Sequence, residues 1–384
     1  MLQVNDHHDS RFNHSRNESS STQALNVLDD CRIKNVRPLI PPQILMEDYP
    51  LSAQAIKTIS KGRAEAESII KGNDDRLLVV VGPCSIHDTK AGLEYAKLLR
   101  AFSDEAKDEL HILMRAYFEK PRTTIGWKGL INDPNLDGSF QINKGLRTAR
   151  SFLIQCSELG VPVAVEFLDQ ISPQYIADTV SWGAIGARTT ESQCHRELAS
   201  GLSTPVGFKN GTNGSVGIAI DAIRAAQAGH VFLSVTKQGL SAIVETHGND
   251  SCHVILRGSN SGPNYSSEHV RACVKELQKA QLRPTVMVDC SHGNSEKQHL
   301  KQLVVVEDIA KQLEAEVTKD YIMGVMIESN LIEGKQSLEA LGPANLAYGQ
   351  SITDACLSWE MTKSGLNRLR EAVKARRSQR SSNA

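Results

Sequence analysis

The chain has 384 residues, and its 43 lysine and arginine side chains nearly balance its 44 aspartate and glutamate side chains, which gives a net charge of -1. This balance argues against nucleic acid or an anionic membrane as a partner, so any charge that binds a ligand must be local. Hydrophobic residues make up 40% of the chain, which is enough for a sizeable core, and the longest apolar runs fall far short of the ~20 residues that cross a bilayer. We therefore expect a globular protein that binds neither nucleic acid nor membranes.

The N-terminal region is polar and differs from the rest of the chain. The first thirty residues contain no apolar segment of the kind found in secretory signals, so we expect a cytoplasmic protein whose eight cysteines are thiols. Residues 1 to about 35 form an aperiodic arm. Isoleucines at roughly helical spacing predict a leading helix from Ser52 to Lys71, with Gly72 as its C-cap. We assign residues 1–74 to this arm and helix, and residues 75–384 to the main domain.

From Arg76 onward, short apolar runs alternate with amphipathic stretches, a rhythm typical of parallel β/α units. Eight runs are predicted to be strands: 77–84, 111–118, 162–167, 184–188, 206–209, 231–235, 286–291 and 324–328. A further pair, 241–246 and 252–257, is predicted to be a β-hairpin inserted after the sixth strand. Eight such units indicate an α/β fold, a TIM (β/α)8 barrel with an N-terminal extension; a doubly wound sheet is the alternative.

Almost every predicted strand ends in or near a polar or charged residue, and in a barrel these ends meet at one mouth. The basic members are Arg115, Lys120, Arg122, Arg188, Lys209 and Arg257. Such a concentration of cations in a near-neutral protein predicts a polyanionic substrate, such as a small phosphorylated acid. Each of these side chains alone could be a solvated surface group, so the prediction depends on their convergence.

A second group combines metal-ligand types: Cys84, His292, Glu328 and, near the end of the chain, Asp354. A thiolate, an imidazole and carboxylates suit a divalent zinc, manganese, iron or cobalt ion better than magnesium or calcium. Plainer interpretations exist: Cys84 as a buried thiol, His292 as a loop histidine, and Asp354 as the acid of a capping box that begins at Ser351. Taken alone, the pattern around Asp354 favours the helix-capping role. A carboxylate at the end of an apolar strand, such as Glu328, is costly to bury without a partner.

Six segments form an ordered set of motifs: VGPCSIHD (81–88), MRAYFEKPRTT (114–124), GARTTES (186–192), GFKNGT (207–212), DCSHGN (289–294) and MIESN (326–330). Together they closely resemble 3-deoxy-D-arabino-heptulosonate 7-phosphate (DAHP) synthase of the type I, microbial class. The resemblance spans about Pro38 to Arg377 and does not cover the polar arm. It implies a transferase that condenses phosphoenolpyruvate with erythrose 4-phosphate and water to DAHP and phosphate, the first step of the shikimate pathway of aromatic amino acid biosynthesis.

The resemblance also implies roles for individual residues. One divalent metal ion would be held by Cys84, His292, Glu328 and Asp354, in place of the capping role for the last. Phosphoenolpyruvate would be bound by Arg115, Lys120, Gly186, Ala187, Arg188, Lys209 and Arg257. Erythrose 4-phosphate would contact Lys120, Pro121, Arg122, Thr123 and Thr124. Glu166 or Lys120 is the candidate for catalytic proton transfer.

Members of this class are inhibited by an aromatic amino acid and assemble as dimers or tetramers, so we expect a regulated homo-oligomer. Gln174, Ser203 and Ser234 fall where the effector pocket lies in relatives, and residues 1–74 are expected to serve regulation and oligomerisation. Two alternative functions are that of a 3-deoxy-octulosonate 8-phosphate synthase, which uses a five-carbon acceptor, and that of an inactive barrel that serves as a regulatory binding protein. The Lys120–Thr124 segment argues against the first, and the intact set of four ligands argues against the second.

Overall fold

The structure, a computed structural model, describes residues 28–122 and 124–382. The chain divides into two compact units, Met1–Leu39 and Ile40–Ala384. In the first unit, the described residues contain a turn in which the backbone N–H of Ile33 donates to the carbonyl of Asp30. Most of the predicted polar arm, residues 1–27, and Thr123 of the predicted acceptor segment lie outside the described residues.

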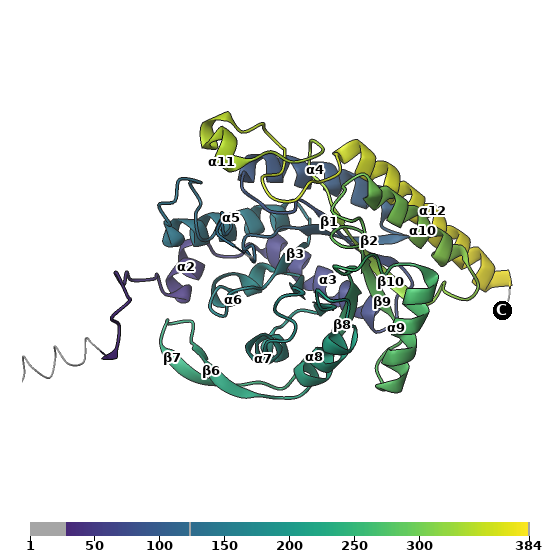
Figure 1. The fold of residues 1–384 in the computed structure, drawn as a ribbon, viewed down its shortest axis with the longest axis horizontal. Helices are drawn as coiled ribbons and strands as arrows, with labels where there is room; N and C mark the ends of the chain where they lie inside the picture. The colour runs from purple at the N-terminus through teal and green to yellow at the C-terminus, as the bar shows by residue number, and fades with distance from the viewer. Residues whose placement is uncertain (1–27, 123, 383–384) are drawn as a thin grey trace, which may run out of the picture. The chain divides into compact units, whose positions relative to one another are not determined.

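Parallel strands of the second unit close into an eight-stranded barrel in the order β1-β10-β9-β8-β5-β4-β3-β2 (Figure 1). The strands are β1 (Leu77–Gly82), β2 (Leu110–Arg115), β3 (Val163–Glu166), β4 (Trp182–Ile185), β5 (Val206–Lys209), β8 (Cys252–Leu256), β9 (Val286–Asp289) and β10 (Ile322–Glu328). Each barrel strand pairs with the barrel strands that come before and after it in the chain, and β10 closes on β1 through register pairs such as Val80 with Met326. The predicted TIM (β/α)8 barrel is confirmed.

Helices lie on the outside of the barrel (Figure 1). The helices are α2 (Pro42–Asp48), α3 (Ala53–Ile70), α4 (Thr89–Ala106), α5 (Ile142–Glu158), α6 (Pro173–Ile176), α7 (Gln193–Gly201), α8 (Gly217–Gln227), α9 (Ser267–Lys279), α10 (Lys301–Glu314), α11 (Leu338–Leu341) and α12 (Trp359–Ser382), with the short 3-10 helices η1 (Ala177–Thr179) and η2 (Pro343–Asn345). Of these, α4 to α10 occur in the connections between barrel strands, α2 and α3 precede β1, and α11 and α12 follow β10. None of the helices in the described part of the chain combines the length and apolar character that a membrane span requires.

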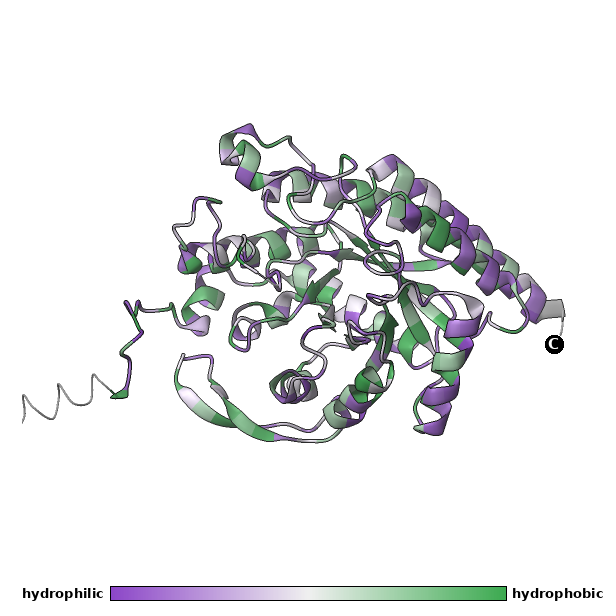
Figure 2. Ribbon diagram, viewed as in Figure 1, coloured by the Kyte–Doolittle hydropathy of each residue, from purple (hydrophilic) through white to green (hydrophobic). Residues whose placement is uncertain are grey.

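The barrel strands are apolar over their whole length because both of their faces are covered, one by the barrel interior and one by helices. All residues of β1 and β10 are buried. Figure 2 shows the barrel strands mostly in green, whereas the outer helices mix green and purple. Their runs of Val, Ile, Leu and Met therefore locate the strands in the sequence, and the predicted strand ends differ from the observed ends by a few residues.

The predicted sixth strand and the predicted hairpin are wrong. β6 (Val231–Val235) pairs antiparallel with β7 (Ser241–Glu245) in a separate two-stranded sheet, and the sixth barrel strand is β8, which pairs in parallel with β5 and β9. The inserted hairpin therefore follows the fifth barrel strand and α8. The physical reason is burial: β8 is buried throughout, whereas Leu233 of β6 is 88% exposed. The apolar composition of the two segments does not show that difference.

The leading helix α3 is confirmed and lies against the end of the barrel where the strands begin. The Ser52 hydroxyl accepts from the N–H of Ala55 at its start, and Gly72 follows its end with φ 75°, a conformation that glycine adopts at little cost. Arg63 donates to the carbonyl oxygens of Ala177 and Val180, which precede β4. Because these contacts are made at the amino ends of the strands, α3 lies opposite the end at which the predicted site residues are found.

Candidate active site

The carboxyl ends of the barrel strands surround a cavity of about 350 Å³. It is lined by Lys120, Pro121, Arg122, Thr124, Ile125, Glu166, Gly186, Ala187, Arg188, Lys209, Thr212, Arg257, His292, Thr353 and Asp354. Most of these residues were predicted from strand ends or motifs. Three predicted residues, Cys84, Arg115 and Glu328, do not line the cavity and are fully buried.

The basic side chains differ in how far their charges are already compensated. Lys209 is buried and its Nζ lies 2.9 Å from Oδ2 of Asp289. Arg188 is exposed and donates from Nη1 to the carbonyl oxygen of Pro121 at 3.1 Å, which links the end of β4 to the segment after β2. Burial lowers the pKa of Arg257, as expected for a cation that faces a partly enclosed cavity. Arg188 and Arg257 thus offer guanidinium groups that a bound anion can reach.

Gly186 makes room for the carboxylate of Glu166. A Cβ atom added at residue 186 would lie 2.3 Å from Oε1 of Glu166, so no larger residue fits there without displacing the acid. Thr190 donates from Oγ1 to the carbonyl oxygens of Gly186 and Lys209, which joins the ends of β4 and β5. Glu166 therefore lies at the cavity wall, in the space that Gly186 leaves.

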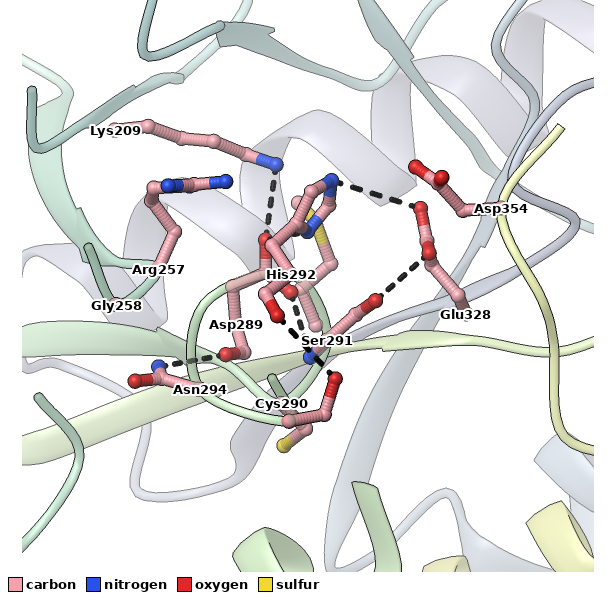
Figure 3. Close-up of polar contacts among 12 residues, drawn as sticks. Lys209, Arg257, Gly258, Asp289, Cys290, Ser291, His292, Asn294, Glu328 and Asp354 are labelled. Atoms are coloured by element: carbon pink, nitrogen blue, oxygen red, sulfur yellow. Dashed lines mark hydrogen bonds and ion pairs between the residues drawn. The ribbon is translucent and has the colours of Figure 1, made fainter. Parts of the chain in front are cut away.

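The predicted metal ligands lie on one side of the cavity. Ligand atoms of Cys84, Glu328 and Asp354 lie within 4.8 Å of one another, and Sγ of Cys84 is 3.9 Å from Oδ2 of Asp354. His292 is oriented toward this group, with Nε2 3.8 Å from Oε1 of Glu328 (Figure 3). One thiol, one imidazole and two carboxylates, converging in this way, form a donor set that fits a divalent transition-metal ion.

The capping interpretation of Asp354 is not supported. Residues 351–354 are not helical, and the next helix, α12, begins at Trp359. Ser351 instead accepts from the N–H of Thr353 in a local turn. The Asp354 side chain is exposed to the cavity, where no helix end needs its carboxylate.

Arg115 and Ser291 hold the buried carboxylate of Glu328. Arg115 Nη2 lies 2.8 Å from Oε1, and the Ser291 hydroxyl donates to Oε2 at 2.7 Å. Burial alone would raise the pKa of Glu328, but the charges of His292, Arg115 and Lys120 outweigh burial and lower it. Arg115 is stacked on Tyr117, with its Cζ 3.6 Å from the ring centre. Arg115 thus keeps a proposed metal ligand ionised from below the cavity.

Lys120 is adjacent to the thiol of Cys84. Its Nζ lies 3.2 Å from Sγ and 3.1 Å from the carbonyl oxygen of the same residue. Burial raises the pKa of Cys84, Glu328 adds to the shift, and Lys120 opposes it. A cation on one side and a metal site on the other are the usual means by which a protein holds a buried thiolate.

Sequence reasoning missed one central residue of the site. Asp289 is fully buried at the end of β9, where its Oδ2 lies 2.8 Å from Nδ1 of His292 (Figure 3). Burial alone would raise the pKa of Asp289, but His292 and Lys209 lower it well below its usual value. The signal that identified Glu328, a carboxylate at the end of an apolar strand, applies equally to Asp289.

A second cavity of about 550 Å³ lies outside the barrel, beside β6, β7, α6 and α7. It brings together the three predicted effector residues, Gln174, Ser203 and Ser234. Its wall combines the apolar Phe232 with ionisable groups such as Lys237, whose Nζ donates to the carbonyl oxygen of Gln174 at 2.6 Å. A pocket of this size and mixed character suits a small amphiphilic molecule.

Comparison with known proteins adds independent evidence. Residues 49–367 match the DAHP synthetase I family. The chain is 59% identical over 349 residues to "Phospho-2-dehydro-3-deoxyheptonate aldolase, Phe-sensitive" of Escherichia coli (strain K12), which covers 91% of this chain and 98% of that protein. It is 54% identical over 368 residues to the tyrosine-inhibited enzyme of the same name from Schizosaccharomyces pombe, covering 95% of this chain and 98% of the relative. The solved structure of phospho-2-dehydro-3-deoxyheptonate aldolase from Francisella tularensis SCHU S4 superposes with a TM-score of 0.87 at 54% identity, covering 90% of this chain and 99% of the other.

Proposed function

This chain belongs to the DAHP synthetase I family, and from that premise we propose which of its residues carry the reaction. The chain is a DAHP synthase: it condenses phosphoenolpyruvate with erythrose 4-phosphate and water, and releases inorganic phosphate. The observation that supports our assignment of the site is the meeting of basic and metal-ligating side chains at one barrel mouth.

Phosphoenolpyruvate binds to the basic wall of the cavity. Arg188, Lys209 and Arg257 take its phosphate and carboxylate, because charge-assisted hydrogen bonds from guanidinium and ammonium groups suit both anions. The backbone of residues 186–187 and the side chain of Lys120 complete the set. Arg115 belongs to it as well, and would have to release Glu328 or the carbonyl oxygen of Cys84 to reach a ligand.

Erythrose 4-phosphate binds along the segment from Lys120 to Thr124. Four residues of this segment line the cavity next to the proposed phosphoenolpyruvate site: Lys120, Pro121, Arg122 and Thr124. Thr123, which is not among the described residues, is the fifth member of the proposed set. The contact of Arg188 with Pro121 holds the two substrate regions side by side, so the C3 carbon of phosphoenolpyruvate can approach the aldehyde.

Proton transfer in the condensation falls to Glu166 or Lys120. Attack of C3 on the aldehyde leaves positive charge at C2 of phosphoenolpyruvate, which water quenches before phosphate leaves. The Glu166 carboxylate, which occupies the space beside Gly186, can take the proton of that water. Lys120 can supply a proton to the oxygen that forms from the aldehyde.

One divalent ion, manganese, iron, cobalt or zinc, would be held by Cys84, His292, Glu328 and Asp354. When bound, it supplies Lewis-acid polarisation of the aldehyde carbonyl of the acceptor sugar. The chain's own contribution is to keep the four ligands ready: Lys120 stands beside the thiol, and Arg115 beside Glu328. Metal dependence is a property of the family; which ion serves here is part of the proposal.

Activity is inhibited by an aromatic amino acid, which we place in the second cavity at Gln174, Ser203 and Ser234. We further propose that the chain works as a homodimer or homotetramer and that residues 1–74 contribute to assembly and regulation. The names of two relatives support inhibition by an aromatic amino acid, since one is called Phe-sensitive and another tyrosine-inhibited.

Phosphate release tests the function directly. The protein is incubated with phosphoenolpyruvate and either erythrose 4-phosphate or arabinose 5-phosphate, with and without a divalent ion. Release only with erythrose 4-phosphate and the ion is expected. Preference for arabinose 5-phosphate would favour the five-carbon acceptor instead, and no release with either sugar would refute catalysis by this chain.

A further inference from the structure

Asp289 connects the two halves of the site. Its buried Oδ2 lies 2.9 Å from Nζ of Lys209, in the proposed phosphoenolpyruvate set, and 2.8 Å from Nδ1 of His292, in the proposed metal set (Figure 3). Oδ1 accepts from the backbone N–H of Ser291 at 3.0 Å. Two hydrogen-bond donors, the Lys209 ammonium and the Ser291 N–H, and the nearby His292 ring thus surround one carboxylate that has no contact with solvent.

The backbone around Asp289 is held firmly. His292 has φ 55°, a left-handed conformation that a side chain with a Cβ rarely adopts. Gly293 and Gly258 pack against each other so closely that a Cβ at Gly293 would lie 2.6 Å from the backbone nitrogen of Ser259. Asn294 donates from Nδ2 to the carbonyl oxygen of Asp289 at 2.8 Å. The backbone that carries Asp289 and His292 is therefore held in one conformation.

We propose that Asp289 is a positioning residue for both halves of the site. It fixes the His292 ring with Nδ1 toward its own carboxylate, so that Nε2 remains free for the metal, and it holds the Lys209 ammonium at the cavity wall. A carboxylate behind a ligating histidine orients the ring and raises the basicity of the ligand. The proposal rests on the proposed function, because it takes from it the roles of His292 and Lys209.

Asp289→Asn is the informative substitution because it keeps the shape and removes one acceptor. An amide has one oxygen acceptor and an NH₂ donor, so the NH₂ group must face either the Lys209 ammonium or the Ser291 N–H, both of which are donors. If Asp289 positions Lys209, the substitution should weaken the binding of phosphoenolpyruvate. If Asp289 acts only through its charge, the substitution should strengthen this binding, because it removes a negative charge near an anion site. The direction of the change thus separates positioning from long-range repulsion.

The test measures binding, so it does not depend on turnover. Chelator-treated wild-type and Asp289→Asn proteins are titrated with Co²⁺, followed by its thiolate absorption, and separately with phosphoenolpyruvate by calorimetry in the absence of metal. We expect Co²⁺ affinity to fall by about ten- to a hundredfold. Phosphoenolpyruvate affinity should fall by about tenfold, the effect of one charge-assisted hydrogen bond. Unchanged affinity for either ligand, or tighter phosphoenolpyruvate binding, would overturn the proposal.

Ser291→Ala is the matched control. Ser291 belongs to the same segment and its hydroxyl holds Glu328, but the structure shows no contact of that hydroxyl with Lys209 among the described residues. The control should weaken Co²⁺ binding and leave phosphoenolpyruvate binding to the metal-free protein intact. Equal loss of phosphoenolpyruvate binding in both variants would mean that any disturbance of the segment has this effect, and the coupling through Asp289 would be refuted.

A measurement on the unmodified protein covers the case in which Asp289→Asn fails to fold. Nitrogen-15 NMR of histidine-labelled, zinc-loaded protein, with the signal of His292 assigned by its loss in His292→Gln, should show Nδ1 protonated and Nε2 bound to metal. A ring bound through Nδ1 would overturn the proposal. Phosphate release is assayed separately, so failure of the proposed function would leave these binding and tautomer results interpretable.

Discussion

Glu119 is a buried acid that the proposed chemistry does not use, and it predicts a pH dependence of stability. Its side chain is buried, and Oε2 accepts a hydrogen bond of 2.8 Å from the Ser172 hydroxyl. Burial raises the pKa of Glu119 from 4.5 to about 8, although the Ser172 hydrogen bond opposes the shift and the charge of Asp169 adds to it. The folded protein therefore keeps this proton at neutral pH, where the unfolded chain has released it.

The sign and size of the effect follow from this difference. Between the two pKa values the unfolded state binds fewer protons, so the free energy of unfolding falls as pH rises. The contribution is complete below pH 4.5 and is lost above about pH 8. At 1.36 kcal/mol per pKa unit, the shift corresponds to at most about 5 kcal/mol over this range. The Glu119→Gln side chain is neutral at every pH, so the variant should not show this loss of stability as pH rises.

The assay is urea unfolding of the wild type and of Glu119→Gln at several pH values from 5 to 9. We expect the two stability curves to diverge as pH rises, with the variant the more stable of the two at pH 9 by several kcal/mol. Glu105→Gln, at an exposed position of α4, is the control and should follow the pH slope of the wild type. Parallel curves for wild type and Glu119→Gln would refute the reasoning.

The other predictions concern the site and its regulation. Cys84→Ala or His292→Ala should abolish phosphate release, because each removes one of four metal ligands; near wild-type turnover of chelator-treated Cys84→Ala would contradict this. Arg188→Ala and Lys209→Ala should each weaken phosphoenolpyruvate binding by roughly ten- to a hundredfold, as calorimetric titration can show, and unchanged affinity in both would mean that the site is misplaced. Deletion of residues 1–35 should leave phosphate release largely intact but blunt inhibition by phenylalanine, tyrosine or tryptophan. Equal inhibition of the truncated protein, with the same oligomeric mass in solution, would show that the arm has no part in regulation.

The barrel could be predicted because a strand that is covered on both faces leaves an apolar run in the sequence. The β1 run Leu77–Gly82 and the β10 run Ile322–Glu328 are of this kind, and both are buried throughout. The hairpin could not be predicted in the same way. Val231–Val235 is equally apolar, yet it pairs outside the barrel and leaves Leu233 exposed. Figure 2 shows much of the β6–β7 ribbon in green although it lies apart from the barrel. Which apolar run closes the barrel depends on pairing between distant segments, and local composition does not encode that pairing.

Much of the site could be predicted for a related reason: a barrel places strand ends that are far apart in sequence around one mouth. His292 and Arg257 were found in this way, and both line the cavity. The depth of each side chain could not be predicted. Arg115 lies below the cavity and pairs with Glu328, while Asp289 went unassigned although it follows an apolar strand, because sequence alone does not show which neighbours an acid meets.

The pairing of buried charges explains why a near-neutral chain can present a basic cavity. A buried cation is stable only with a partner, and two buried cations of the site have one each: Arg115 pairs with Glu328, and Lys209 with Asp289. In the described part of the chain, Arg188 and Arg257 form no such ion pair, and both line the cavity. The two acids therefore compensate the charges of Arg115 and Lys209 and leave those of Arg188 and Arg257 uncompensated. A dianionic phosphate is attracted to these two guanidinium groups, which keeps it away from the carboxylates that are needed for the metal.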